Sequence, residues 1–118
     1  LKEKGVHCIS VQPDNPMHGL EGWKHMETAI VPGIYDNSVA DEEMVVGTEI
    51  AYSYAKAATK YLGLLLSPSA AANLVAALKV AETLEQGTVV TVFADNGMKY
   101  LQDNFWKEND YAIENPFI

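Results

Sequence analysis

Apolar positions along the chain fall into short runs, some with strand-like and some with helical spacing. Val6–Gln12 and Glu43–Val46 predict two short strands, and Thr88–Phe93 is the clearest strand pattern because β-branched residues fill most of it. Since this last run lacks polar alternation, it is typical of a strand covered on both faces. Helical segments lie between the runs, so the pattern favours an α/β fold with a largely parallel or mixed sheet.

Two longer segments have helical spacing. Thr48 is a suitable N-cap for a first helix that continues to Leu62, after which a glycine stops it. An Ala-rich second helix follows the Ser67–Ser69 turn and extends to about Glu85. The apolar stripe expected for the first helix consists of Ile50, Tyr54, Ala57, Ala58 and Leu62. That expected for the second consists of Leu74, Ala77, Leu78, Ala81 and Leu84.

The remaining segments predict an incomplete unit. Leu1–Gly5 has the pattern of a last helical turn feeding a strand, so we expect a partner strand before residue 1 and a longer protein. Pro13–Pro32 predicts a long loop with one helical turn around Glu21–Met26. Met98–Asp103 predicts a short helix, and the tail, residues 104–118, is expected to be irregular and docked on the surface. We therefore expect residues 1–118 to form a single, incomplete α/β domain.

Composition narrows the class of protein. The 118 residues are 48% apolar and 20% charged, as in a soluble globular domain. A net charge of −8 argues against binding to nucleic acid or to an anionic membrane surface. Cys8 is the single cysteine, so no intrachain disulfide forms, and a reducing, cytoplasmic setting is expected. The three histidines match no ligand spacing, so we expect no metal site.

Two small polar turns are the candidate ligand-binding features. Ser67–Ser69 and Asp95–Gly97 each follow an extended segment and precede a helix. Because ligands in α/β sheets bind beyond the carboxyl ends of strands, both turns are candidates for that edge. Ser69 has two alternative roles: it can cap the N–H groups at the start of the second helix, or it can turn its hydroxyl toward a ligand there.

Three stretches resemble a known enzyme family. They are His18–Gly22, Leu66–Leu78 and Val89–Leu101. Ser67-Pro68-Ser69-Ala70-Ala71-Ala72-Asn73 is similar to the family's Gly-Ile-Ser-Ser-Gly-Ala-Ala, and Ala94-Asp95-Asn96-Gly97-Met98-Lys99-Tyr100-Leu101 is similar to its Pro-Asp-Ser-Gly-Glu-Arg-Tyr-Leu. In order and spacing, residues 6–103 resemble the C-terminal part of the cysteine synthases, pyridoxal-phosphate enzymes of the tryptophan-synthase-β type that also include cystathionine β-synthase.

The resemblance implies a fold and a cofactor site. It implies a three-layer α/β architecture, part of the large domain of that fold, with a mixed or parallel sheet and flanking helices. Ser69 corresponds to the serine whose hydroxyl bonds the pyridine nitrogen of the cofactor, and Asp95 and Asn96 correspond to the turn beside the same ring edge. Gly22, with the neighbouring His18, corresponds to the loop that lines the substrate entrance. The chain departs from the family at Ala71, where glycine is usual, and at Met98, where glutamate is usual.

The family's remaining machinery is not found in this sequence. No stretch resembles the Ser-Val-Lys-Asp-Arg motif of the Schiff-base lysine, the Thr-Ser-Gly-Asn substrate loop or the Gly-Thr-Gly-Gly-Thr phosphate loop. The resemblance thus implies a cysteine-biosynthetic enzyme, a homodimer with pyridoxal phosphate, an activated serine and sulfide, in which this chain carries no catalytic residue and is inactive without an N-terminal part. The alternatives are a cystathionine β-synthase, a serine or threonine dehydratase, or a non-catalytic, self-associating fragment.

Overall fold

The computed structural model describes residues 1–118 and contains a small parallel sheet. Strands β1 (Ile9–Pro13) and β2 (Glu42–Val46) pair in parallel, with Ile9 opposite Glu42 and Pro13 opposite Val46. The α/β class and the parallel pairing are confirmed. Within this chain the partner of β1 is the downstream strand β2, and the partner strand expected before residue 1 lies outside the described residues. Residues 6–8 lie outside β1, because β2 begins only at Glu42 and offers them no ladder partner.

Two helical segments form the rest of the framework. Helix α1 (Thr48–Ala57) continues as a π-helix, η3 (Ala58–Leu62), and ends at Gly63, whose φ of 68° is a left-handed conformation. Helix α2 (Pro68–Glu82) follows. The N-cap of α1 is Gly47 and Thr48 is the first helical residue, so the expected cap was one residue late. The short elements are η1 (Lys2–Lys4), η2 (Asn37–Val39), η4 (Met98–Tyr100), α3 (Asn104–Lys107) and η5 (Asn109–Tyr111).

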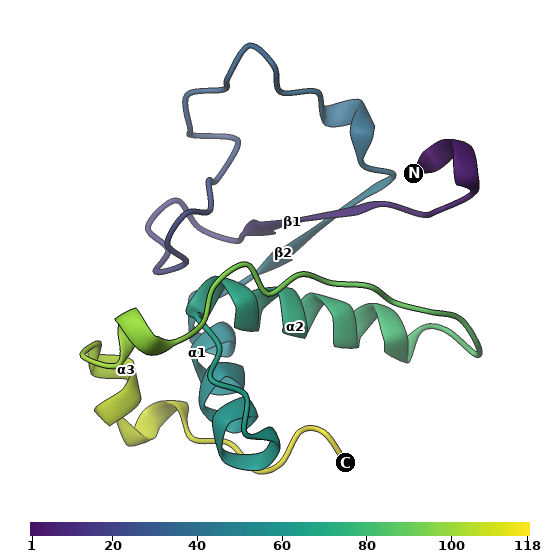
Figure 1. Cartoon of the computed structure of the whole chain (residues 1–118). Helices are drawn as coiled ribbons and strands as arrows, with labels where there is room; N and C mark the ends of the chain where they lie inside the picture. The colour runs from purple at the N-terminus through teal and green to yellow at the C-terminus, as the bar shows by residue number, and fades with distance from the viewer.

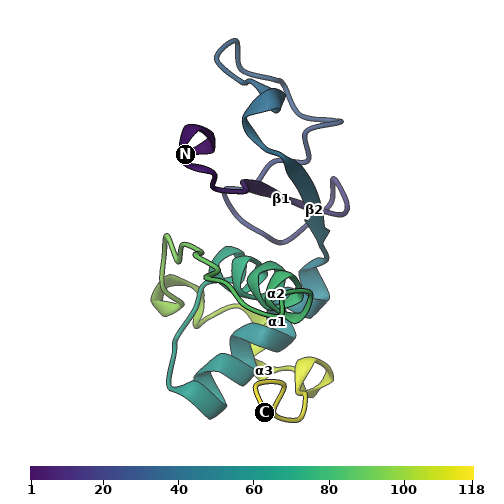
Figure 2. The same ribbon diagram turned by 90° about the vertical axis from the view of Figure 1, so that its right-hand side faces the viewer.

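The helices lie on one side of the sheet. Figures 1 and 2 show α1 and α2 below β1 and β2, with the long segment between the two strands on the opposite side. The helices α1 and α2 thus cover one face of this two-stranded sheet. The N-terminus lies beside the sheet and the C-terminus lies beyond α1 (Figure 1). No helix combines the length and apolar character needed to cross a lipid bilayer.

Small side chains fill the contact between the helices. The small residues of the two buried clusters are Ala51, Ala55, Ala58, Ala70, Ala71, Ala72, Val75 and Ala76. The stripe predicted for α2 is only partly buried: Leu74 packs against a core cluster, whereas Ala81 is exposed and Leu84 is 46% exposed. The buried face of α2 is rotated toward Ala72 and Val75. Ile50 and Leu62 of the other predicted stripe are also exposed. The reason is that alanine allows two helix backbones to approach closely, which larger side chains would prevent.

The clearest predicted strand is not paired. Residues 88–93 are extended but belong to no sheet, and Val90 is 84% exposed. The prediction of a strand covered on both faces was wrong for this structure, because no other strand lies alongside it. A cavity of about 460 Å³ separates this segment from β1 and α2. One side-chain bond ties the segment down, from Asn73 Nδ2 to the Val92 carbonyl at 2.9 Å.

The loop contains less helix than expected, and the tail contains more. No helical turn forms around Glu21–Met26, where the chain makes only hydrogen-bonded turns. The tail contains α3 and η5 and docks firmly: the Phe105 ring stacks on Tyr52 with centroids 4.2 Å apart, and Lys56 Nζ donates to the Phe105 carbonyl at 3.0 Å. Residues 104–118 are thus surface-docked, as expected, but not wholly irregular.

Candidate functional site

The start of α2 separates the roles of its two serines. Ser67 is fully buried and is the N-cap, with its Oγ accepting from the Ala70 N–H at 3.2 Å. Pro68 occupies the first helical position, where the absence of an N–H carries no cost. Ser69 comes next, and its Oγ lies 3.4 Å from Ser67 Oγ. The capping role considered for Ser69 is therefore taken by Ser67, and the one hydrogen-bonding neighbour of the Ser69 hydroxyl is the hydroxyl of Ser67.

The turn at residues 95–97 lies beside this helix start. Leu66 and Asn96 form an isolated antiparallel bridge, and the Gly97 N–H donates to the Leu65 carbonyl at 3.0 Å. The approach is close enough to require glycine, because a Cβ on Gly97 would lie 2.9 Å from the Leu66 carbonyl oxygen. The structure thus brings two of the three motif stretches together.

The side chains of this turn form hydrogen bonds and an ion pair with residues of the turn and of the short helix that follows it. The Asp95 carboxylate pairs with Lys99 at 2.7 Å and accepts from the Asn96 N–H at 2.9 Å. The hydrogen bond from Lys99 holds the pKa of Asp95 below its ordinary value. Asn96 Oδ1 accepts from the Met98 N–H at 2.9 Å. A ligand beside this turn would therefore meet a neutralised carboxylate rather than a free negative charge.

The third stretch, residues 18–23, is anchored on both helices. Leu20 is fully buried in a cluster that includes Ala51 of α1 and Ala72 of α2. The Gly19 N–H donates to Thr48 Oγ1 at 2.9 Å, and His18 Nδ1 accepts from the Leu20 N–H at 3.1 Å. Gly22 lies at the exposed tip with a φ of 84°, a conformation that glycine adopts without strain.

Tyr100 joins all three stretches and was not singled out from the sequence. Its phenol donates to Glu21 Oε2 at 3.3 Å, while its ring, 6% exposed, belongs to the buried cluster that contains Leu66 and Ala70. Burial raises the pKa of the Tyr100 phenol further above neutral pH, where an ordinary tyrosine hydroxyl already carries its proton and can donate. Tyr100 lies inside one motif, but its partner is 79 residues away, and no sequence spacing signals such a bond.

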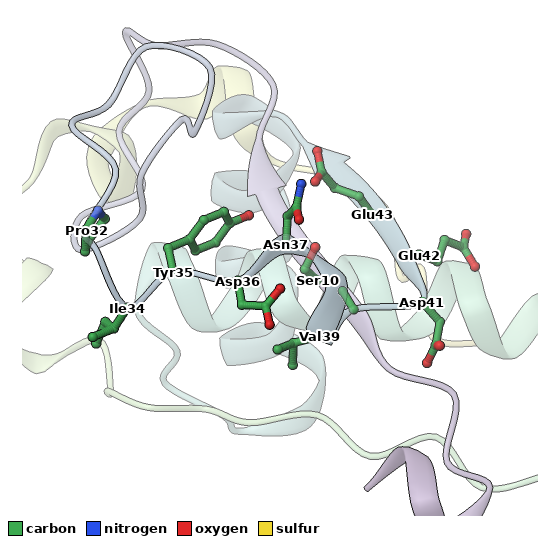
Figure 3. Close-up of a pocket in the computed structure, with 11 residues that line it drawn as sticks. Ser10, Pro32, Ile34, Tyr35, Asp36, Asn37, Val39, Asp41, Glu42 and Glu43 are labelled. Atoms are coloured by element: carbon green, nitrogen blue, oxygen red, sulfur yellow. The ribbon is translucent and has the colours of Figure 1, made fainter.

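A prominent cavity lies elsewhere. It measures about 660 Å³ and is lined by Ser10, Pro32, Ile34, Tyr35, Asp36, Asn37, Val39, Ala40, Asp41, Glu42 and Glu43 (Figure 3). Four carboxylates and no basic side chain line it, so it would repel a phosphate-bearing cofactor. It contains none of the site residues expected from the sequence. No group of three or more His, Cys, Asp or Glu side chains is placed to hold a metal ion.

Comparisons with known proteins find similarity over nearly the whole chain. A cysteine synthase of Aquifex aeolicus is 39% identical over 109 residues, which are 89% of this chain and 33% of that protein. An O-acetylserine-dependent cystathionine β-synthase of Bacillus subtilis is 34% identical over 115 residues, 91% of this chain and 38% of the relative. No protein-family model matches the chain.

The fold is also that of solved enzymes. The crystal structure of a cysteine synthase from Entamoeba histolytica superposes with a TM-score of 0.82 and 29% identity, covering 97% of this chain and 36% of that one. The chain therefore spans about a third of the length of the proteins that it matches. Within that third, the two-stranded parallel sheet and the helices agree with the known fold.

Proposed function

We propose that this chain, whose resemblance to the cysteine synthase and cystathionine β-synthase family is now confirmed, forms the C-terminal part of a pyridoxal-phosphate-dependent cysteine synthase. The proposal is that the whole enzyme makes cysteine from an activated serine and sulfide. The observation that carries it is the convergence of residues 18–22, 66–78 and 89–101 around the start of α2. The names of the similar proteins favour the same activity.

The start of α2 fits the pyridine ring of this cofactor. Ser69 carries a half-buried hydroxyl at the positive end of a 15-residue helix. Because Ser67 is the N-cap of this helix, the Ser69 hydroxyl is not needed for capping. Pyridoxal phosphate, when bound, supplies the electron sink that permits replacement at the β-carbon of serine. A neutral hydroxyl bonded to the ring nitrogen would leave that nitrogen unprotonated, which mutes the sink and favours β-replacement over transamination.

The other site residues have supporting roles in this proposal. The backbone of the Asp95–Asn96 turn would border the ring edge, and the salt bridge from Lys99 would keep Asp95 from competing for the ring nitrogen. Gly22 and His18 contribute the loop at the substrate entrance. The His18 ring is fixed by the Leu20 N–H, so its contribution is to loop shape rather than to proton transfer.

The covalent and phosphate contacts would come from the rest of the enzyme. No motif for the Schiff-base lysine or for the phosphate loop occurs in this sequence. We accordingly propose that residues 1–118 alone neither retain the cofactor nor catalyse, and that the N-terminal part is their obligate partner in a cytoplasmic homodimer.

A second candidate activity is cystathionine β-synthesis. The B. subtilis relative bears that name and is 34% identical. The two activities differ only in the nucleophile, sulfide or homocysteine, and nothing in residues 1–118 distinguishes them.

The test is a spectrum followed by three assays on the full-length protein that carries these residues. The proposal predicts the visible absorbance of protein-bound pyridoxal phosphate, and cysteine formation with sulfide that exceeds both cystathionine formation with homocysteine and elimination to water. A full-length protein without visible cofactor absorbance would exclude this function, and a non-catalytic fragment would then be the better account.

A further inference from the structure

Tyr100 contacts each of the three stretches that form the proposed site. It lies three residues after Gly97, the last residue of the Asp95–Gly97 turn, and its N–H donates to the Gly97 carbonyl at 3.0 Å. Its ring lies in the cluster formed with Leu66, Ala70 and Ala71, which flank Ser69 in the sequence. Its phenol reaches across to Glu21, the neighbour of Gly22. One side chain therefore connects the turn at residues 95–97, the start of α2 and the loop at residues 18–22.

The outer part of the loop has no other side-chain tether. Leu20 anchors its inner side, and the Trp23 N–H returns to the Leu20 carbonyl at 3.1 Å, which closes a tight turn. Glu21 and Gly22 are exposed between these two points. The bond from Tyr100 is the one side-chain hydrogen bond that Glu21 makes. Loss of this bond would leave the tip of the loop fixed only by its own backbone.

We propose that Tyr100 is a positioning residue that fixes the Gly22 loop at a set distance from the start of α2. The inference rests on the proposed function, because it treats these two segments as the walls of one site. Ring and hydroxyl have separable tasks: the ring fills the cluster below Ser69, and the hydroxyl holds the loop. A loop that is ordered before substrate arrives loses less conformational entropy on binding, so the hydroxyl affects substrate affinity more than turnover.

Lys99 does not replace this contact. Its ammonium lies 5.2 Å from the centroid of the Tyr100 ring and pairs with Asp95 within the same turn. It approaches no residue of the loop. Tyr100→Phe therefore removes the link and keeps the packing, whereas Glu21→Gln keeps an acceptor oxygen and serves as the conservative variant.

The first experiment uses the full-length protein that carries these residues and needs no activity. Amide exchange is followed by NMR at Gly19, Leu20 and Trp23, whose N–H groups are all bonded within or beneath the loop. Tyr100→Phe is expected to speed their exchange by about 3- to 10-fold, the loss expected for one hydrogen bond, while exchange in β1 stays unchanged. Glu21→Gln should remain near wild type. Tyr61→Phe is the matched control, because no hydrogen bond involves that hydroxyl.

Two results would overturn the inference at this stage. Unchanged exchange in Tyr100→Phe would show that the hydroxyl does not hold the loop. Equal acceleration in the loop and in β1 would show that it supports the whole fold instead.

The second experiment uses the full-length protein and separates this inference from the proposed function. Tyr100→Phe should raise the KM for the activated serine by about 3- to 10-fold with a smaller change in kcat, and should leave the visible cofactor absorbance unchanged. A wild-type KM in a variant that shows the absorbance would overturn the inference alone. Absence of the absorbance from the wild-type protein would overturn the proposed function, and with it the link from Tyr100 to substrate.

Discussion

Ser67 and Ser69 lie two residues apart at the start of α2, yet they differ in burial and in hydrogen bonding. Ser67 has no exposed surface and caps the helix through the Ala70 N–H. Ser69 is half-buried, and the Oγ of Ser67 is its one hydrogen-bonding neighbour in the chain. A sequence motif with two serines does not reveal which of the two hydroxyls caps the helix. The backbone at Ser67, extended at φ −68° and ψ 161°, decides it.

Alanine substitution of each serine separates the two roles. Ser67→Ala should lower the free energy of unfolding by about 1 kcal/mol, because the buried Ala70 N–H loses its acceptor. Ser69→Ala should change it by less than about 0.5 kcal/mol. Urea unfolding of the two variants measures both values. Equal losses would mean that Ser69 shares the cap and is not free for a ligand.

Gly97 sets how closely the 95–97 turn approaches the segment before α2. A Cβ there would lie 2.9 Å from the Leu66 carbonyl oxygen and 3.0 Å from Leu65 Cδ1. Gly97→Ala should therefore cost about 1–3 kcal/mol of stability, since the backbone oxygen cannot move aside freely. Gly33→Ala is the control, because its Cβ would meet no atom within 4 Å. Equal thermal stability of the two variants would contradict the close approach.

At the scale of elements, β1 and β2 are tied at their starts by one carboxylate. Asp41 Oδ2 accepts from the Cys8 N–H at 2.8 Å, and Asp41 Oδ1 lies 3.3 Å from Lys2 Nζ. The backbone bond, reinforced by Lys2, holds the pKa of Asp41 below its ordinary value of 3.8. The β1–β2 pairing therefore depends on an ionised side chain outside the ladder.

Titration tests this connection. Because the folded pKa is depressed, the unfolded state binds more protons below pH 3.8, so the stabilisation is present above that pH and is lost as pH falls through the folded pKa. NMR titration of the Asp41 carboxyl should give a pKa below 3.8, and Asp41→Asn should weaken the acid dependence of stability. A carboxyl that titrates at or above the ordinary value would contradict the bond to Cys8.

The two strand-like patterns behave differently because burial depends on neighbours. Val46 is 1% exposed in β2, whereas Val90 is 84% exposed in the unpaired segment. Val46→Thr should cost about 1–3 kcal/mol, since it buries a hydroxyl, while Val90→Thr should stay within about 0.5 kcal/mol. Urea unfolding compares the two. A large loss at Val90 would mean that residues 88–93 are packed more tightly than the structure shows.

At the scale of the whole molecule, the sequence predicted classes of element better than their contacts. Local chemistry predicted the α1–η3 and α2 helices, the end of the first helical segment at a glycine and the parallel α/β class. All of these are present in the structure. The predicted buried stripes were only partly right, because α1 and α2 meet through alanines such as Ala55 and Ala71, which carry little hydrophobic signal. The prediction of a covered strand at residues 88–93 was wrong because a strand-like pattern does not show whether a partner strand lies beside it.

The candidate site shows the same limit. The motifs at Ser69, Gly22 and Asp95 were found from resemblance, and their convergence is a property of the fold. The bond between Tyr100 and Glu21 and the packing of Gly97 on Leu66 join residues far apart in the sequence, so only coordinates show them. Ser69 itself remains a proposed cofactor contact.

The most direct test of the central claim is a pyridoxal phosphate titration of the full-length protein, followed by its visible absorbance, in the wild type and in Ser69→Ala. Ser53→Ala is the control, because Ser53 is a serine of α1 outside the proposed site. The account predicts saturable absorbance in the wild type and in the control, and an affinity about 3- to 10-fold weaker in Ser69→Ala, as expected for one lost hydrogen bond. Equal affinity in all three proteins, or no visible absorbance in any of them, would contradict it.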